Sequence, residues 1–174
     1  MEQIRIITKG RDLRKIGAKA FMDYINPFVK EKSFIALNKP VTLKGEKEWL
    51  SRNAKDIDKK DKIFVILFID KKIAGTCTVW RDNLQVRRHN ITFAISVAKK
   101  YRGKGYGKML LKKTMQIAKK KLKPKKMWIE HIEGNKIARK LYQELGFVQV
   151  ARFNDYVNHF GRYKDQIIME YKGK

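Results

Sequence analysis

The stretch ISVAKKYRGKGYGKMLLKKTMQIA, residues 95–118, joins an apolar strand pattern to a helical pattern through three alternating glycines. Gly103, Gly105 and Gly107 fall where that helix should begin, although glycine inside a helix costs about 1 kcal/mol relative to alanine. Bare backbone lets N–H groups approach a ligand closely, and a helix N-terminus adds unpaired donors and partial positive charge. The stretch therefore predicts an anion site, and a pyrophosphate is the anion we expect there.

Two common phosphate-binding motifs do not fit this loop. A Walker loop reads G-x-x-x-x-G-K-[ST], but here Arg102 replaces the first glycine and Met109 replaces the serine or threonine. A dinucleotide fingerprint reads G-x-G-x-x-G, and its last glycine is replaced by Lys108 or Leu110 in the two registers. The motif that remains is R-G-x-G-x-G. Arg102 could supply charge-assisted hydrogen bonds to an anion bound there. The alternative is that the loop is only a flexible, glycine-rich connector.

The rest of the chain alternates strand and helix patterns. Strands are expected at residues 4–8, 62–70, 73–80, 91–98, 126–132, 147–153 and 165–171, and helices at 12–29, 46–53, from the glycine loop to about 122, and at 135–145. Residues 71–72 should form the tight turn of a hairpin. Without a low-complexity linker, this order predicts a single domain, residues 1–174, of the α/β (α+β) class: a mixed six- to seven-stranded sheet with helices on both faces.

Composition limits the partners of the protein. Lys and Arg number 42 against 17 Asp and Glu, and the net charge of +25 should attract nucleotides, nucleic acids and acidic surfaces; genome composition or heat adaptation is the alternative explanation. With Cys77 as its single cysteine the chain has no intramolecular disulfide, and its three histidines lack metal-ligand spacing, so no metal is expected. We find neither a membrane span nor a signal-peptide pattern, and the cytoplasm is the expected compartment.

The glycine loop and a second segment together carry a specific resemblance. R-G-K-G-Y-G at residues 102–107 resembles the acetyl-coenzyme A signature [RQ]-x-x-G-x-[GA] of the GNAT N-acetyltransferase superfamily. The family's second signature has an asparagine, a small residue, a tyrosine and L-G-F, which are matched here by Asn135, Ala138, Tyr142 and residues 145–147. The two signatures match in order and separation, so the resemblance covers residues 91–147 strongly and the rest by strand order.

The resemblance implies that acetyl-CoA is the co-substrate. Its pyrophosphate would sit on the backbone amides of the loop, and its pantetheine arm would pair like an added strand with the end of strand 91–98. The acetyl thioester would face the gap between strands 91–98 and 126–132. The implied donor-site residues are Val97, Ala98, Arg102, Gly103, Lys104, Gly105, Tyr106, Gly107, Lys108, Asn135 and Ala138.

Acetyl transfer needs a base, because a protein amine is mostly protonated at pH 7. The resemblance implies Glu130 for this role, since it precedes Asn135 by five residues and Tyr142 by twelve. The same spacing occurs in the branch that acetylates ribosomal-protein N-termini, within an L-E-V-R strand where this chain has I-E-H-I. Glu133 is a weaker candidate, and a solvated strand carboxylate is the alternative for Glu130.

Tyr142 is the candidate acid that would act on the leaving thiolate. The alternative is that it only packs in the hydrophobic core. A phenol of pKa about 10 is a weaker acid than a thiol of pKa about 8.5, so full proton transfer to the leaving thiolate is uphill by roughly 2 kcal/mol. We therefore expect Tyr142 to stabilise the thiolate by hydrogen bonding, and we expect Arg139 and the basic surroundings to favour the phenolate. Cys77 is expected to be a buried structural thiol rather than an acetyl carrier.

Three segments should contact the acceptor: the residues after the first helix, RDNLQVRRHN at 81–90, and ARFNDYVNHFGRYKD at 151–165. Their aromatic and basic residues suit a peptide or a nucleic-acid surface, with hairpin packing as the alternative. We expect direct acetyl transfer, in a ternary complex, to a primary amine of a protein N-terminus or lysine, with RNA, DNA or the ribosome held by the basic surface. Two alternatives stay open: acetylation of a small amine or RNA base, and a nucleic-acid-binding module with a coenzyme A fold and little catalysis.

Overall fold

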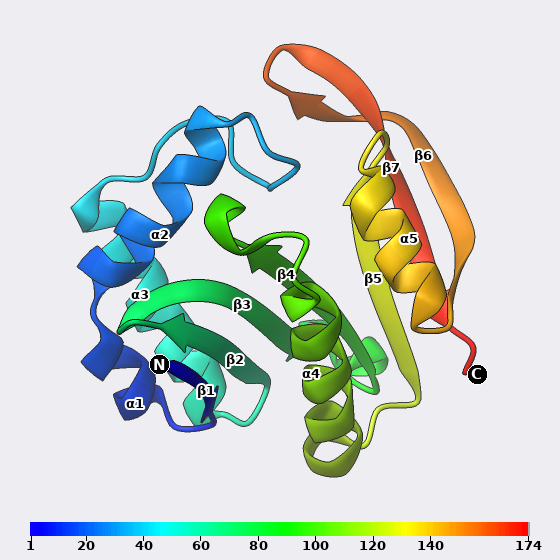
Figure 1. Ribbon diagram of the computed structural model, residues 1–174. Coiled ribbons are helices and arrows are strands. Elements are labelled where there is room, and N and C mark those ends of the chain that lie inside the picture. The colour runs from blue at the N-terminus through cyan, green and yellow to red at the C-terminus, as the bar shows by residue number, and fades with distance from the viewer. Residues whose placement is uncertain (174) are drawn as a thin grey trace.

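The protein folds into one mixed sheet of seven strands with helices on both faces, which confirms the predicted fold class (Figure 1). The computed structural model describes residues 1–173, and the strand order is β1-β2-β3-β4-β5-β7-β6. The strands are β1 (Glu2–Ile7), β2 (Lys62–Ile69), β3 (Lys72–Arg81), β4 (Asn90–Val97), β5 (Lys126–Ile132), β6 (Phe147–His159) and β7 (Arg162–Tyr171). The helices are α1 (Gly10–Ile16), α2 (Ala18–Lys30), α3 (Leu43–Asp58), α4 (Tyr106–Leu122) and α5 (Lys136–Glu144).

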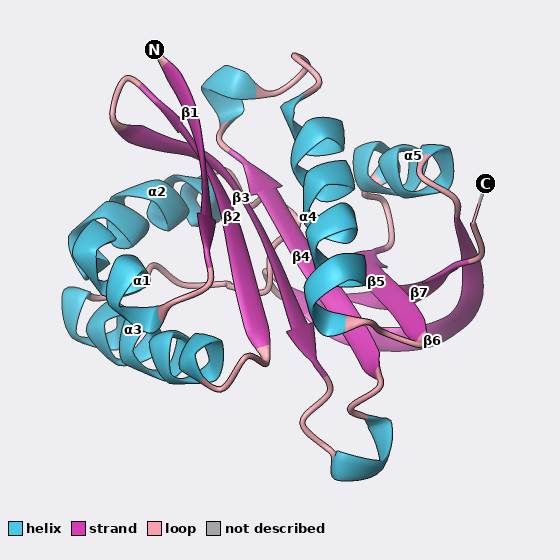
Figure 2. Cartoon of the chain, turned by 90° about the horizontal axis from the view of Figure 1, so that it is seen from below, coloured by secondary structure: helices cyan, strands magenta, loops and turns pink. Residues whose placement is uncertain are grey.

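The sheet opens into a wedge between its two parallel strands. Strand β4 pairs with β5 only from Asn90–Phe93 to Lys126–Ile129, whereas β3 stays paired with β4 as far as Val97. Within residues 1–173 the stretch from 94 to 97 therefore has no strand partner on its β5 side. The glycine loop follows directly at this open end, so the wedge and the loop form one continuous region (Figure 2).

Two hydrophobic cores hold the sheet, one on each face, because β2 is apolar on both sides. Ile63, Val65 and Leu67 pack in the core covered by α4 and α5. Phe64, Ile66 and Phe68 pack in the core covered by α1, α2 and α3. Helices α1–α3 lie mainly over β1, β2 and β3, and α2 also reaches β4 through the Tyr24 hydroxyl, which bonds Ser96. In the described chain no helix covers the same face of β5, β7 and β6 (Figures 1 and 2). We call this uncovered half the open face.

Three expectations about local structure are wrong. The helix expected at 12–29 is broken at Gly17, whose φ of 86° and ψ of 146° are not helical, so α1 and α2 are separate. Helix α3 begins earlier and ends later than expected, because the Thr42 side chain caps it by accepting the Gly45 N–H at 3.1 Å and its last turns are buried against the sheet at Ile57. The β2–β3 turn lies at Asp70 and Lys71, which both have positive φ, rather than at residues 71–72.

The last hairpin is longer than its sequence suggests. Strands β6 and β7 are joined by only two residues, Phe160 and Gly161, so most of the expected loop at 151–165 is strand. Tyr156 and Tyr163 are 69% and 67% exposed, because this end of the hairpin extends beyond the helices. Because neither face of this end of the hairpin is buried, its sequence lacks the alternation of apolar and polar residues that is typical of a strand.

Candidate active site

The glycine loop has the geometry of an anion site at the start of α4. Gly103 and Gly105 adopt φ values of 77° and 79°, which L side chains rarely take, and no other described residue lies within 4 Å of a Cβ built at either position. Gly105 is the N-cap of α4, and the first intrahelical bond is the one that Met109 donates to its carbonyl at 3.1 Å. The Arg102 amide already donates to the Lys99 carbonyl at 3.2 Å, but the amides of Tyr106, Gly107 and Lys108 at the helix start are free to face a ligand, and the loop fits a diphosphate.

Gly107 differs from the other two glycines. Its φ is not positive, and an added Cβ would lie 3.5 Å from Leu141 Cδ2 and 3.9 Å from Val97 Cγ2, which is ordinary contact. Both neighbours of that Cβ are apolar side chains packed against the core. Of the three glycines that the sequence singles out, the backbone conformation therefore requires two, and alanine fits the third position.

Arg102 is held by the protein itself. Its Nε donates to the Val97 carbonyl at 2.9 Å, its Nη1 pairs with Glu31 at 2.7 Å, and the guanidinium lies 5.2 Å from the Phe28 ring centroid. The neighbouring Ala98 N–H donates to the Ala74 carbonyl of β3 at 2.9 Å, so it faces away from the wedge. Arg102 thus fastens the end of α2 to the end of β4, and its charge is shared with Glu31.

The other loop side chains lie at the surface. Lys104 is exposed, Lys108 pairs with Glu144 at 2.9 Å, and the Tyr106 hydroxyl hydrogen-bonds to Glu2. These contacts fix the rim of the loop, so that its backbone rather than its side chains presents the binding surface.

Glu130 stands at the fork of the wedge. Ile129 is the last residue of β5 that pairs with β4, and Glu130 is the next residue along the strand. Strand alternation turns its side chain away from the buried Ile129 and His131 and onto the open face, where it is exposed. Gln166 of β7 donates a hydrogen bond to Glu130 Oε2 at 2.6 Å, which orients the carboxylate.

Tyr142 reaches the region from the helix-covered face. It is 4% exposed, with its ring centroid 6.1 Å from that of His131 and 6.2 Å from that of Phe147. Its hydroxyl forms no hydrogen bond with any residue from 1 to 173. Burial raises the pKa of Tyr142, with the nearby Cys77 as a smaller cause. The expectation that basic surroundings favour the phenolate is therefore wrong, because loss of solvent outweighs the distant positive charges.

Asn135 has a structural task in the free protein. Its Oδ1 accepts the Ala138 N–H at 3.1 Å and so caps α5, while its Nδ2 has no partner in the described chain. Ala138 packs against the core on the same side as Tyr142. The asparagine amide is thus anchored at one end and available at the other.

Two other candidate residues, Glu133 and Cys77, are less suited to catalysis. Glu133 pairs with Arg152 at 2.9 Å, which leaves Glu130 as the better-placed carboxylate. Cys77 is fully buried and beside Thr114, and burial raises the pKa of its thiol to about 12, as expected of a structural thiol.

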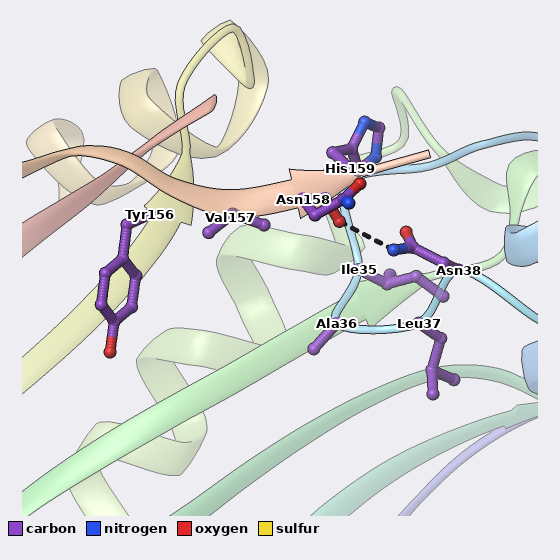
Figure 3. Close-up of a pocket in the computed structure, with 8 residues that line it drawn as sticks. All are labelled: Ile35, Ala36, Leu37, Asn38, Tyr156, Val157, Asn158 and His159. Atoms are coloured by element: carbon purple, nitrogen blue, oxygen red, sulfur yellow. Dashed lines mark hydrogen bonds between the residues drawn. The ribbon is translucent and has the colours of Figure 1, made fainter. Parts of the chain in front are cut away.

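Two of the three segments expected to contact the acceptor meet at the mouth of the open face. Asn38 Nδ2 donates to the Asn158 carbonyl at 2.7 Å (Figure 3). His159 Nε2 donates to the Ser33 carbonyl at 3.1 Å. Residues 35–38 and 156–159 line a pocket of about 290 Å³ between these segments. The third segment, 81–90, lies at the opposite end of β4, where Arg81 bonds the Leu122 carbonyl at 2.7 Å, and it is distant from the wedge.

Sequence reasoning missed the residues that join these parts. Glu31 bonds both Arg102 and the Ser33 hydroxyl, and Gln166 orients Glu130. Their partners are between 2 and 71 positions away in the chain, and most lie on a different element. A local signal existed only for Gln166, which alternates with buried residues along β7.

A family model settles the relationship. The model described as the acetyltransferase (GNAT) family matches residues 29–147. The chain belongs to the GNAT family of acetyltransferases. This GNAT acetyltransferase has no significant match among curated proteins. Within residues 1–173 there is no helix long and apolar enough to cross a membrane, and no group of three or more His, Cys, Asp or Glu placed to hold a metal ion.

Solved structures share its fold at low sequence identity. A GNAT-family acetyltransferase from Streptococcus pneumoniae is 22% identical, with a TM-score of 0.79 and 98% of each chain covered. A ribosomal-protein-alanine N-acetyltransferase from Brucella melitensis is 21% identical, with a TM-score of 0.79 and coverage of 97% of this chain and 98% of that one. The yncA protein from Salmonella typhimurium, solved with its cofactor acetyl-CoA, is 18% identical, with a TM-score of 0.80 and coverage of 98% and 92%.

Proposed function

We propose that this GNAT acetyltransferase moves the acetyl group of acetyl-CoA to a primary amine of a protein by direct attack while both substrates are bound. The observation that carries the proposal is the placement of Glu130 and Tyr142 on opposite faces of the sheet beside the wedge. An amine entering from the open face would meet the carboxylate first. A thiol leaving on the helix-covered face would meet the phenol hydroxyl.

The donor would bind across the glycine loop and the wedge. Free amides at the start of α4 would hold its diphosphate, and the unpaired edge of β4 near Val97 would pair with its pantetheine arm. Asn135 Nδ2 is available for the same arm. Bound acetyl-CoA supplies an activated acetyl thioester, and the protein supplies position and proton handling.

Glu130 would remove the proton that blocks attack. An α-amine with a pKa of about 8, or a lysine with one of about 10.4, is mostly protonated at pH 7. Because Gln166 occupies Oε2 of Glu130, Oε1 is left for the amine or for one intervening water. The nitrogen lone pair can then form the C–N bond as the C–S bond breaks.

Tyr142 would stabilise the departing sulfur. Its raised pKa keeps the hydroxyl protonated, so it donates a hydrogen bond without giving up its proton. The thiolate can take its proton from solvent once it leaves the site. A hydroxyl without a protein partner is free for this contact.

The acceptor that fits best is a protein α-amine followed by an uncharged side chain. The described lining of the pocket in Figure 3 has no Lys, Arg, Asp or Glu; Asn38, Asn158 and His159 offer polar groups beside Leu37 and Tyr156. Small polyamines fit less well, because a net charge of +25 repels cations. The similarity to a ribosomal-protein-alanine N-acetyltransferase supports the same class.

Mass spectrometry of peptide products tests this proposal. The panel contains peptides with a free N-terminus and no lysine, and matched peptides with a blocked N-terminus and one lysine. We expect acetylation at the α-amine, with higher kcat/KM when the first side chain is uncharged, and a large loss in Glu130→Gln. Acetylation of the lysine peptides alone, or of polyamines or RNA alone, would contradict it.

A second candidate role is association with a polyanion such as RNA. The outer face of α4 carries exposed lysines that form no ion pair with another described residue, namely Lys112, Lys120 and Lys121. An electrophoretic shift with RNA at two salt concentrations tests it, because binding through phosphate contacts weakens steeply as salt rises. A shift that salt does not change would count against it.

A further inference from the structure

A second pocket lies across β5 from the wedge. It has a volume of about 290 Å³ and is bounded by the N-terminal half of α5 and by residues of β6 and β7. Because the strand order is β4-β5-β7-β6, this pocket and the wedge lie on opposite sides of β5. Its lining shares Asn135 with the proposed donor site, but His131, Lys136, Arg139 and Gln149 have no role there, so the pocket needs a separate explanation.

His131 lines this pocket and carries a buried nitrogen without a hydrogen-bond partner among residues 1–173. The residue is 7% exposed, and its Nε2 is buried without a hydrogen-bond partner in the described chain. Its Nδ1 lies 3.1 Å from the Ile132 carbonyl, and a carbonyl oxygen can only accept, so Nδ1 carries the proton. In the neutral ring Nε2 is therefore unprotonated and can only accept a hydrogen bond. Leaving it unsatisfied costs free energy, so a ligand that donates a hydrogen bond to it is favoured.

The same pocket is positively charged. Lys136 and Arg139 line it, and their side chains form no ion pair with any residue from 1 to 173. Arg152 also lines it, but its charge is compensated by Glu133 and Asp165. The lining thus carries two uncompensated cations, which favour an anion over a neutral or cationic ligand.

We infer that this pocket binds a small oxyanion that carries its own hydroxyl hydrogen, with inorganic hydrogen phosphate as the simplest case. Arg139 and Lys136 take the negative charge, and Nε2 of His131 accepts the hydroxyl hydrogen. Gln149, also in the lining, offers a further neutral hydrogen-bonding group. A fully deprotonated oxyanion such as sulfate satisfies the cations but sets an oxygen lone pair against Nε2.

Calorimetric titration with sodium phosphate and sodium sulfate at pH 7 and equal ionic strength tests this inference. We expect phosphate to bind about tenfold tighter or more, the factor typical of leaving a buried acceptor unsatisfied. His131→Phe should abolish the preference for phosphate while leaving the affinity for sulfate within about twofold. Arg139→Gln should lower the affinity for both ions. Lys140→Gln, on the same helix but outside the lining, is the matched control and should change neither.

Nitrogen NMR of the imidazole rings gives a test that needs no variant. We expect His131 to show a protonated Nδ1 and a bare Nε2 in the free protein, and its Nε2 signal to shift when phosphate is added. Phosphate should still bind in the presence of saturating acetyl-CoA, because Lys136, Arg139 and His131, which would hold the ion, are outside the proposed donor site. Equal binding of both ions, a protonated Nε2, or displacement of phosphate by acetyl-CoA would overturn the inference.

Discussion

The glycine loop gives the sharpest prediction, because its three glycines are not equivalent. Replacing Gly105 by alanine forces an L residue to a φ of 79°, while no other described residue lies close enough to the new Cβ to clash. The cost is therefore the conformational cost of the left-handed region alone, about 1–2 kcal/mol. Gly107→Ala adds the same methyl group at a position without positive φ, where it makes ordinary contacts.

This cost should be divided between stability and donor binding. If the loop keeps its conformation, Gly105→Ala lowers the free energy of unfolding; if the loop relaxes, the amides leave their positions and acetyl-CoA binds more weakly. We expect the two losses together to amount to about 1–2 kcal/mol, which as affinity alone is about 5- to 30-fold. Gly107→Ala should leave the affinity for acetyl-CoA within about twofold. Its free energy of unfolding should be unchanged or slightly higher, because alanine has a higher helix propensity than glycine.

Calorimetry with acetyl-CoA and urea unfolding measure both quantities on the same samples. The reasoning is refuted if Gly105→Ala changes neither, since the positive φ would then carry no cost. It is refuted equally if Gly107→Ala weakens binding as much as Gly105→Ala, since added bulk rather than backbone conformation would then be the cause.

Three further predictions concern the site and its surroundings. Glu130→Gln should lower kcat/KM about 10²- to 10⁴-fold near neutral pH, and a change within twofold would exclude Glu130 as the base. Tyr142→Phe should lower the single-turnover rate by roughly 10-fold or more through a lost hydrogen bond to a charged group, with little change in unfolding free energy; a wild-type rate across pH would remove this role. The amide of Asp155 and the Arg152 side chain hold the pKa of Asp165 below its usual value, so its contribution to stability is present above about pH 4 and lost as pH falls through the folded pKa. Urea unfolding of wild type and Asp165→Asn should therefore differ at pH 6 and converge in acid; a constant difference would contradict the linkage.

The contacts of Arg102 connect the glycine loop to the pocket of Figure 3. The chain of hydrogen bonds runs from the end of β4 through Arg102 and Glu31 to Ser33, whose carbonyl accepts from His159 in the β6–β7 hairpin. Variants of the glycine loop should therefore be assayed with both substrates, because a displaced Arg102 also releases the segment that borders the pocket of Figure 3.

The sequence by itself predicted the family, singled out the glycine loop and gave the strands in their observed order along the chain, although it merged α1 and α2 into one helix. The two-faced burial of β2 appears as a continuous apolar run, and the glycines appear where a helix begins, because strand burial and helix starts leave signals within a few residues. For the same reason the positions of Glu130, Asn135 and Tyr142 on their elements could be assigned from spacing.

Only the tertiary structure decided what those residues experience. Packing of α5 against the sheet buries Tyr142 and raises the pKa of its hydroxyl, although the surrounding sequence is rich in lysine and arginine. The place where β4 parts from β5 puts Glu130 at the fork, and Gln166 orients it from a distant strand. The unsatisfied nitrogen of His131 follows from packing against α5. Solvent exclusion and contacts across the sheet depend on residues far apart in the chain, and no local pattern records them.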